Sequence, residues 1–220
     1  MSLNSRLKQV SEKLNLLQPI WQQERNLRTS YIEEDEVFVH QPVPSSQLDD
    51  IESRHGINFP EAYRAFLEQI GDIVVGPGLG MEPLEKSIYQ HSSESFPLDR
   101  PFLGELSIEH QSLPESEKRE SYLSLGKQWD KIPKEHGVLL IADYGCAIYA
   151  MLVLNGPMIG QIWMQQGEVS YYGPYGGYEG FDDERYTFEG ITNTPSEYYF
   201  LEWYEFWLDV QIREWVDLEE

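Results

Sequence analysis

Carboxylates, one cysteine and five histidines are the residues of this chain that could do chemistry. Asp182-Asp183-Glu184 could hold a divalent cation, because hard cations take carboxylate oxygens as ligands. The run lacks the alternating ligands of a dedicated calcium loop, so we interpret it as a solvated acidic surface. The histidines show no metal-ligand spacing such as HExxH; they are His40, His55, His91, His110 and His136.

Cys146 could act as a nucleophile with a histidine from elsewhere in the fold, because such pairs are spatial rather than sequential. It lies between Gly145 and Ala147 at a turn or strand start, where we expect a small packed residue. Asp143 follows an apolar strand, as a catalytic acid at a strand end would. Neither residue gives positive support for catalysis. We predict that the chain is not an enzyme and has no catalytic, cofactor-binding or metal-binding residues.

A glycine-rich stretch from Glu168 to Arg185 combines aromatic and acidic residues. Tyrosine supplies anchoring area at protein interfaces, and carboxylates mimic the phosphates that a nucleic-acid-binding partner would hold. We therefore predict a partner-binding loop whose residues are Tyr171, Tyr172, Tyr175, Tyr178, Asp182, Asp183 and Glu184. The alternative is a glycine-rich loop that folds onto its own sheet.

The net charge restricts the partners that the chain can have. With 38 acidic and 16 basic residues, the formal net charge is −22 at pH 7. Such a field repels nucleic acid and anionic membranes, since both require a cationic surface. Acidic residues far outnumber Arg185 and Arg213 between Glu179 and Glu220, whereas residues 1–30 are mildly basic. The acidity serves either solubility or attraction of a basic partner.

Three β-prone segments between residues 137 and 164 must position these residues: GVLLIAD, CAIYAMLVL and MIGQIWM. Tyr144-Gly145 and Asn155-Gly156-Pro157 are turn signals between them, so we predict an antiparallel meander. Both strand faces are apolar; one can pack on helices, and the other needs cover from the N-terminal region or a partner. A broad apolar stripe predicts a final helix that begins at Thr194-Pro195-Ser196-Glu197, which has the pattern of a capping box.

Two further helical patterns stand at the N-terminal side. Leu3, Leu7, Val10, Leu14 and Leu17 form a two-heptad stripe that packs on its own domain or serves a homodimer, and Pro19 is expected to end or bend this helix. LDDIESRHGINFPEAYRAFLEQIGD, which spans residues 48–72, predicts a helical hairpin punctuated by glycine and proline.

This hairpin resembles the opening of the SUKH superfamily, typified by the fungal Smi/Knr cell-wall synthesis regulator. The matching positions are Gly56, Phe59, Pro60, Tyr63, Phe66, Leu67 and Gly71. The Asp-x-Gly-Cys element at residues 143–146, the Asn-Gly-Pro…Gly-x-x-Trp element at 155–163 and LEWYEFWLD at 201–209 resemble a bacterial branch. In that family, the position of Asp143 organises the turn. The resemblance covers about residues 45–80 and 137–210.

The resemblance implies an α+β domain, an antiparallel meander with helices packed mainly on one side, here with an added N-terminal helix. We expect an N-terminal helix and acidic connector over residues 1–40 and a SUKH-like domain over 41–220. Within that domain, residues 85–136 are treated as an insertion of loops with room for one helix. Bacterial members are associated with immunity to polymorphic or contact-dependent toxins, many of them nucleases, and fungal relatives are interaction hubs.

The expected function is therefore binding. The first hypothesis is a cytoplasmic immunity protein that neutralises a basic toxin domain by direct contact, without nucleic-acid or membrane binding. The alternative is an intracellular regulatory or scaffold protein related to the cell-wall regulators. A single cysteine fits a reducing compartment, and no apolar run is long enough for a membrane span.

Overall fold

A four-stranded antiparallel sheet lies at the centre of the chain. The computed structural model describes residues 1–28, 41–72, 75–167, 169, 171–175 and 198–215. The strands follow each other in the sheet in chain order: β1 (Val138–Gly145), β2 (Ile148–Val153), β3 (Ile162–Gln166) and β4 (Tyr171–Pro174). The predicted meander over residues 137–164 is confirmed, and so is the α+β class.

The two faces of the sheet belong to two separate apolar cores, because successive side chains of a strand point to opposite sides. Leu152 and Ile162 contribute to the larger core, whereas Val153 and Trp163 contribute to the smaller one. A register irregularity between Leu140 and Ala142 lets β1 keep both faces buried. The strands therefore need cover on both sides.

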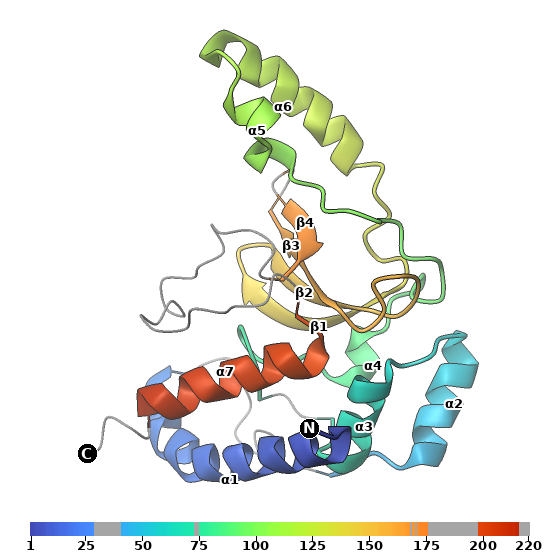
Figure 1. Ribbon diagram of the computed structural model, residues 1–220, viewed down its shortest axis with the longest axis vertical. Coiled ribbons are helices and arrows are strands. Elements are labelled where there is room, and N and C mark those ends of the chain that lie inside the picture. Colours follow the sequence, from blue (N-terminus) through green and yellow to red (C-terminus); the bar gives the residue numbers. More distant parts are fainter. Residues whose placement is uncertain (29–40, 73–74, 168, 170, 176–197, 216–220) are drawn as a thin grey trace.

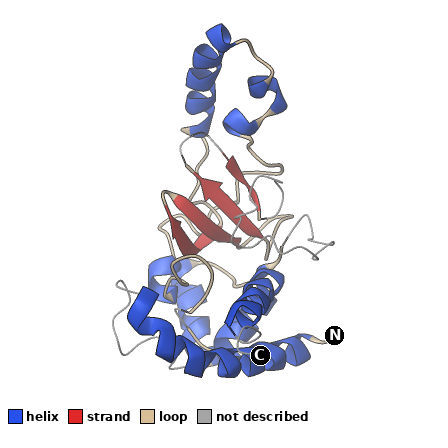
Figure 2. Cartoon of the chain, turned by 90° about the vertical axis from the view of Figure 1, so that its left-hand side faces the viewer, coloured by secondary structure: helices blue, strands red, loops and turns tan. Residues whose placement is uncertain are grey.

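Helices cover the larger core on one side of the sheet (Figures 1 and 2). They are α1 (Leu3–Arg28), α2 (Ser45–His55), α3 (Glu61–Gln69) and α7 (Phe200–Trp215). The predicted stripe of α1 is buried in this core, where α1 packs against α7 and α3. The stripe thus packs on its own domain, and a homodimer through it would have to expose these side chains.

Pro19 does not end α1, which continues to Arg28. A proline inside a helix removes one backbone hydrogen bond and costs about 3 kcal/mol. Leu7, Val10, Leu14 and Leu17 are each 1% exposed or less, so tertiary packing of the stripe outweighs that cost.

The helical hairpin of residues 48–72 forms as predicted and is locked by one glutamate. Gly56 ends α2 in the left-handed conformation at φ 64°. Glu52 then accepts a hydrogen bond from the backbone N–H of Phe59 at 2.6 Å and forms an ion pair with Arg64. These contacts fix the angle at which α3 leaves α2.

The segment 85–136 is more helical than expected and covers the second face of the sheet. It contains α4 (Leu84–Ser87, which starts one residue earlier), the 3₁₀ turn η1 (Gly104–Leu106), α5 (Ile108–Gln111) and α6 (Glu115–Trp129). Phe96, Phe102 and Trp129 pack on the smaller core. The cover expected from the N-terminal region or a partner is thus supplied by this segment. Residues 104–129, the arm, extend away from the sheet (Figure 1).

Two local predictions were wrong because the sheet extends further than the pattern suggested. Tyr171 and Tyr172 were expected in a loop, but they lie in β4 and pair with Gln166 and Gln165. The helix expected from Thr194 begins at Phe200, because Tyr198 and Tyr199 are drawn to the start of β3 by backbone hydrogen bonds. The capping box at 194–197 lies outside the described residues.

Candidate functional site: an aromatic hollow

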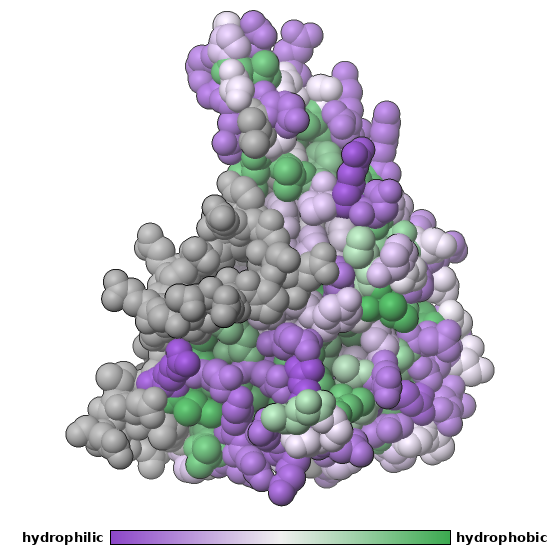
Figure 3. Space-filling view, viewed as in Figure 1, coloured by the Kyte–Doolittle hydropathy of each residue, from purple (hydrophilic) through white to green (hydrophobic). Residues whose placement is uncertain are grey.

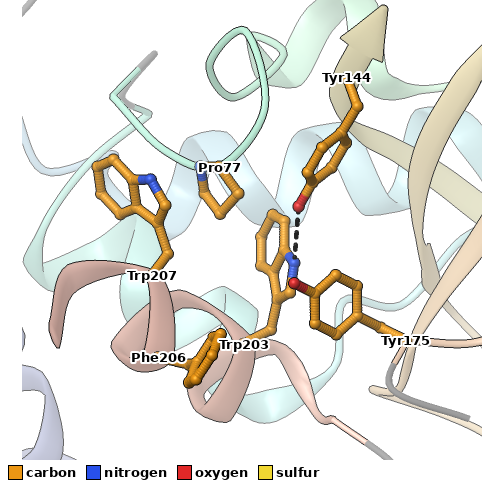
Figure 4. Close-up of a pocket in the computed structure, with 6 residues that line it drawn as sticks. All are labelled: Pro77, Tyr144, Tyr175, Trp203, Phe206 and Trp207. Atoms are coloured by element: carbon orange, nitrogen blue, oxygen red, sulfur yellow. Dashed lines mark hydrogen bonds between the residues drawn. The ribbon is translucent and has the colours of Figure 1, made fainter. Parts of the chain in front are cut away.

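A small hollow lies where α7, the end of β1 and the loop 75–80 meet (Figure 4). Its walls are Pro77, Tyr144, Tyr175, Trp203, Phe206 and Trp207. Five of these six side chains are aromatic, and the lining is almost entirely apolar. None of the described residues that line it carries a charge.

Helix α7 supplies one wall through the spacing of its residues. Trp203, Phe206 and Trp207 stand at i, i+3 and i+4 and therefore share one side of the helix. Trp203 and Trp207 are buried at 1% and 5% exposure, whereas Phe206 is half-buried. The indoles thus form the floor and Phe206 stands nearer the mouth.

The loop 75–80 supplies the opposite wall, and backbone contacts hold it against β1. The N–H of Leu79 donates to the carbonyl oxygen of Asp143 at 2.7 Å. Gly78 has φ +69°, and a Cβ there would lie 2.5 Å from the same carbonyl oxygen. The hydroxyl of Tyr204 donates to the carbonyl of Val75 at 2.7 Å. The close approach at Gly78 places Pro77 at the hollow.

The tyrosines complete the site from the sheet side. Trp203 Nε1 donates to the hydroxyl of Tyr144 at 3.2 Å, which satisfies the buried indole N–H and fixes both rings (Figure 4). The ring of Tyr175 meets that of Tyr198 edge-on at 5.2 Å. Tyr198 in turn lies 5.7 Å from Phe206. The walls are therefore held by one another.

The residues predicted for partner binding do not lie together in the described structure. Tyr171 and Tyr172 are 1% and 0% exposed and pack into opposite cores, and burial raises the pKa of both hydroxyls above the usual range. In this position they stabilise the sheet and offer no surface. Tyr175 follows β4 and lines the hollow. Tyr178, Asp182, Asp183 and Glu184 lie outside the described residues.

The candidate chemical groups near the hollow have structural explanations. Asp143 accepts a hydrogen bond from the N–H of Gly145 at 2.7 Å and thereby organises the β1–β2 turn, as the resemblance implied. Cys146 is exposed at this turn with φ 51°, so the prediction of a packed cysteine was wrong. The two-residue turn requires positive φ at its centre, which points the thiol outward. Within the described part of the chain, no group of three or more potential ligands could hold a metal ion.

Sequence reasoning missed most of the hollow. The sequence placed Trp203 and Trp207 only on the widened apolar stripe of the last helix. The breadth of that stripe indicated that the helix is buried on more than one side, and the structure buries both residues. No sequence pattern predicted that Pro77 and Tyr144 would line the hollow, because the contact between their segments depends on the fold.

Charge around α7 is partly neutralised by α1. Arg6 forms ion pairs with Glu202 at 2.6 Å and Glu205 at 2.7 Å, and Lys13 reaches Asp209 at 2.5 Å. The hydrogen bonds that Arg6 donates to Glu205 and to Glu202 raise the pKa of Arg6 against the effect of burial. The basic N-terminal region therefore pairs with the acidic C-terminal helix. On the face shown in Figure 3, hydrophilic side chains cover much of the surface.

A comparison with protein-family models finds a match to the SMI1 / KNR4 family (SUKH-1) over residues 42–192, more than half of the chain. The chain belongs to the SMI1/KNR4 family. The match includes the helical hairpin, all four strands and the segment 85–136, which the resemblance had left outside. Comparisons with curated proteins and with solved structures gave no match.

Membership of the SMI1/KNR4 family supports a protein-interaction module in general, of the immunity or of the regulatory kind. The family match covers three walls of the hollow, Pro77, Tyr144 and Tyr175, whereas α7 lies beyond the matched range. Among the described residues, no helix is both long enough and apolar enough to cross a bilayer.

Proposed function

We propose that this protein is a non-catalytic immunity protein of the cytoplasm that neutralises a basic toxin domain, most naturally a nuclease, by direct binding. The observation that carries the proposal is the position of Tyr175. It belongs to the stretch that the sequence predicts for partner binding, and it lines the hollow together with side chains from distant elements.

The composition of the hollow supports an interface. Tyrosine and tryptophan dominate the residues whose removal weakens protein complexes most, because they bury large area at little cost in conformational entropy. Tyr144, Tyr175 and Phe206 are half-buried, so each keeps part of its ring at the surface. The ring of Tyr198 contacts Tyr175 and Phe206, and the indole N–H of Trp203 donates to Tyr144. A rigid anchor of this kind is what a tight, specific partner requires.

Charge supports a basic partner. The net charge of −22 favours rapid, salt-sensitive association with a cationic protein and disfavours direct contact with nucleic acid. The carboxylates of Asp182, Asp183 and Glu184 remain part of the proposed surface and would meet the basic residues with which a nuclease holds phosphate.

The test is a pull-down from the native host followed by binding measurements on the captured toxin-like domain. At low salt, about 50 mM, we expect one basic partner, and at about 500 mM salt we expect its loss because the Debye length shortens. Co-expression of the two proteins should also rescue growth that the toxin domain alone arrests. Several housekeeping partners, or none, would instead favour the regulatory alternative.

The site within that complex is tested by variants. Tyr175→Ala combined with Asp182→Ala and Asp183→Ala should weaken binding by about 2 kcal/mol or more, or about 30-fold. Tyr122→Ala is a matched control, because Tyr122 is a 39% exposed tyrosine on the arm, remote from the hollow in sequence. Unchanged affinity in the triple variant would show that the partner binds elsewhere.

A further inference from the structure

An apolar tip lies where the β1–β2 turn meets the loop 75–80. Leu79 is 62% exposed, the largest value among the described large hydrophobic residues after Met1 at the chain end. Cys146 and Ala147, the two central residues of the turn, are exposed as well. A Cβ added at Gly145 would lie 4.0 Å from Leu79 Cδ1, so the leucine side chain lies beside this turn. Leu79, Cys146 and Ala147 are called the tip below.

Hydrogen bonds fix the backbone of the tip. The N–H of Leu79 donates to the carbonyl oxygen of Asp143 at 2.7 Å, and that of Gly80 donates to the carbonyl oxygen of Pro77 at 3.2 Å. Across the contact, the carboxylate of Asp143 accepts a hydrogen bond from the N–H of Gly145 at 2.7 Å. Because the backbone is already ordered, a partner that covers the tip loses little affinity to the ordering of a loop.

The turn consists of residues that its conformation disfavours. Gly145 pairs with Ile148, so the turn has two central residues, and Asn-Gly is the favoured sequence for such a turn. Here Cys146 has φ 51° and Ala147 has φ 60°. The left-handed region destabilises non-glycine residues, and residues held in such regions cluster at functional sites. The chain thus places two weakly polar or apolar side chains at an exposed turn at the expense of stability.

The charge beside the tip suits a cationic partner. The segments 75–82 and 142–149, which form the tip and its base, contain Glu82 and Asp143 and no lysine or arginine. Both acids lie along β1, since the N–H of Glu82 donates to the carbonyl oxygen of Ile141 at 3.0 Å. A basic surface therefore meets opposite charge next to the apolar side chains. A second copy of this chain would meet like charge, because its net charge is also −22.

We infer that the tip is a contact surface for the basic partner, which covers it with an apolar recess bordered by lysine or arginine. This inference rests on the proposed function and adds a second surface to the one proposed at Tyr175. The two surfaces are neighbours: a Cβ at Gly78 would lie 3.1 Å from Tyr144 Cδ2, and Tyr144 and Tyr175 line the same hollow. The tip itself requires no cavity in this chain, because its side chains are exposed.

The first experiment compares two leucines of equal exposure. Leu79→Ala and Leu123→Ala each remove a mostly exposed side chain, 62% and 59% exposed, and Leu123 lies on the arm. Calorimetric titration with the basic domain captured in the pull-down should show at least about fivefold weaker binding for Leu79→Ala and less than about twofold for Leu123→Ala. Circular dichroism checks that both variants keep the fold.

A second pair of variants tests the charge beside the tip. Leu79→Lys and Leu123→Lys change the net charge of the chain equally, so the overall attraction of a basic domain falls equally in both. At Leu79 the new ammonium group also opposes the basic border of the recess. We therefore expect Leu79→Lys to weaken binding at least about tenfold more than Leu123→Lys does.

A third variant separates the stability of the turn from its proposed role. Cys146→Asn combined with Ala147→Gly installs the favoured turn sequence and removes both side chains of the turn. The urea midpoint of the chain alone should rise, because the backbone strain is relieved. Affinity for the captured domain should nevertheless fall at least about threefold, because two contacts at the tip are lost.

The single cysteine provides a probe within the unmodified chain. N-ethylmaleimide is uncharged and can alkylate the chain only at Cys146, and the mass of the chain reports the rate. In the complex we expect alkylation to be at least about tenfold slower than in the free chain, because reaction requires access to the thiol.

The results distinguish this inference from the proposed function. A basic domain that binds the Leu79 and Leu123 variants equally, or that leaves the alkylation rate unchanged, would preserve the immunity role and remove the tip from the interface. Failure to capture any basic domain would contradict both the immunity role and the assignment of the tip to a basic partner. A urea midpoint that does not rise in the Asn-Gly variant would contradict the strain from which the role of the turn is inferred.

Discussion

At the scale of single residues, Gly78 lets the loop 75–80 approach β1 closely at the hollow. Gly78→Ala should lower the free energy of unfolding by about 2–5 kcal/mol, because left-handed backbone costs a non-glycine residue about 1–2 kcal/mol and overlap with the carbonyl of Asp143 adds about 1–3 kcal/mol. Urea denaturation followed by circular dichroism measures the change.

Gly156→Ala is the matched control for this substitution. Gly156 has φ +77°, close to that of Gly78, but an added Cβ would meet nothing within 4 Å. The control should therefore show only the backbone cost, about 1–2 kcal/mol. Equal losses in the two variants would mean that the close approach of the loop 75–80 to β1 does not contribute.

Single residues also show where sequence reasoning stops. Tyr175 was predicted for the site and does line the hollow, whereas Tyr171 and Tyr172 are buried in β4. Alternation of two tyrosines between two cores can be recognised only when both faces of the sheet are known to be covered. Cys146 was assigned a packed position because burial statistics describe cysteine on average, and they cannot anticipate a turn with positive φ.

At the scale of elements, the contact between α1 and α7 depends on Arg6. Arg6→Ala should lower the free energy of unfolding by about 1–3 kcal/mol, because two half-buried carboxylates, Glu202 and Glu205, lose their charged hydrogen-bond partner. The guanidinium is 24% exposed, so added salt should reduce the loss only in part.

Lys8→Ala provides the comparison on the same helix. Its pair with Glu12 measures 3.7 Å, and the two side chains are 78% and 61% exposed, so we expect a change below about 0.5 kcal/mol. A loss at Lys8 as large as that at Arg6 would show that both act through the helicity of α1 and not through α7.

Elements with strong local signals were predictable, and those defined by distant contacts were not. In the hairpin at residues 48–72 and the strands from 137 to 164, glycine and proline mark the ends of the elements, and β-branched residues favour the strands. Helix α6 begins in a charged run after Pro114, and its low amphipathicity hid it. Its role as cover for the smaller core followed only from the packing of Trp129.

At the scale of the whole molecule, tyrosines buried on both sides of the sheet link stability to alkaline pH. Burial raises the pKa of Tyr63, Tyr171, Tyr172 and Tyr204, and it raises that of Tyr89 to about 12, with a further contribution from Glu135. In the unfolded chain a tyrosine titrates near pH 10. The folded state therefore keeps protons that the unfolded state releases above that pH.

The sign follows from this difference in proton binding: stability is fully present below pH 10 and is lost as the pH rises toward 12 and beyond. The urea midpoint should stay level up to about pH 9.5 and then fall, and the tyrosinate absorbance of the buried residues should appear together with the loss of ellipticity.

Tyr172→Phe should make the fall of the urea midpoint less steep and should cost about 1 kcal/mol of stability at neutral pH, since the hydroxyl donates to the carbonyl of Lys134 at 3.1 Å. A midpoint that is constant to pH 12, or ionisation of these tyrosines before unfolding, would show that the two cores admit water and that the sheet is not sealed on both faces.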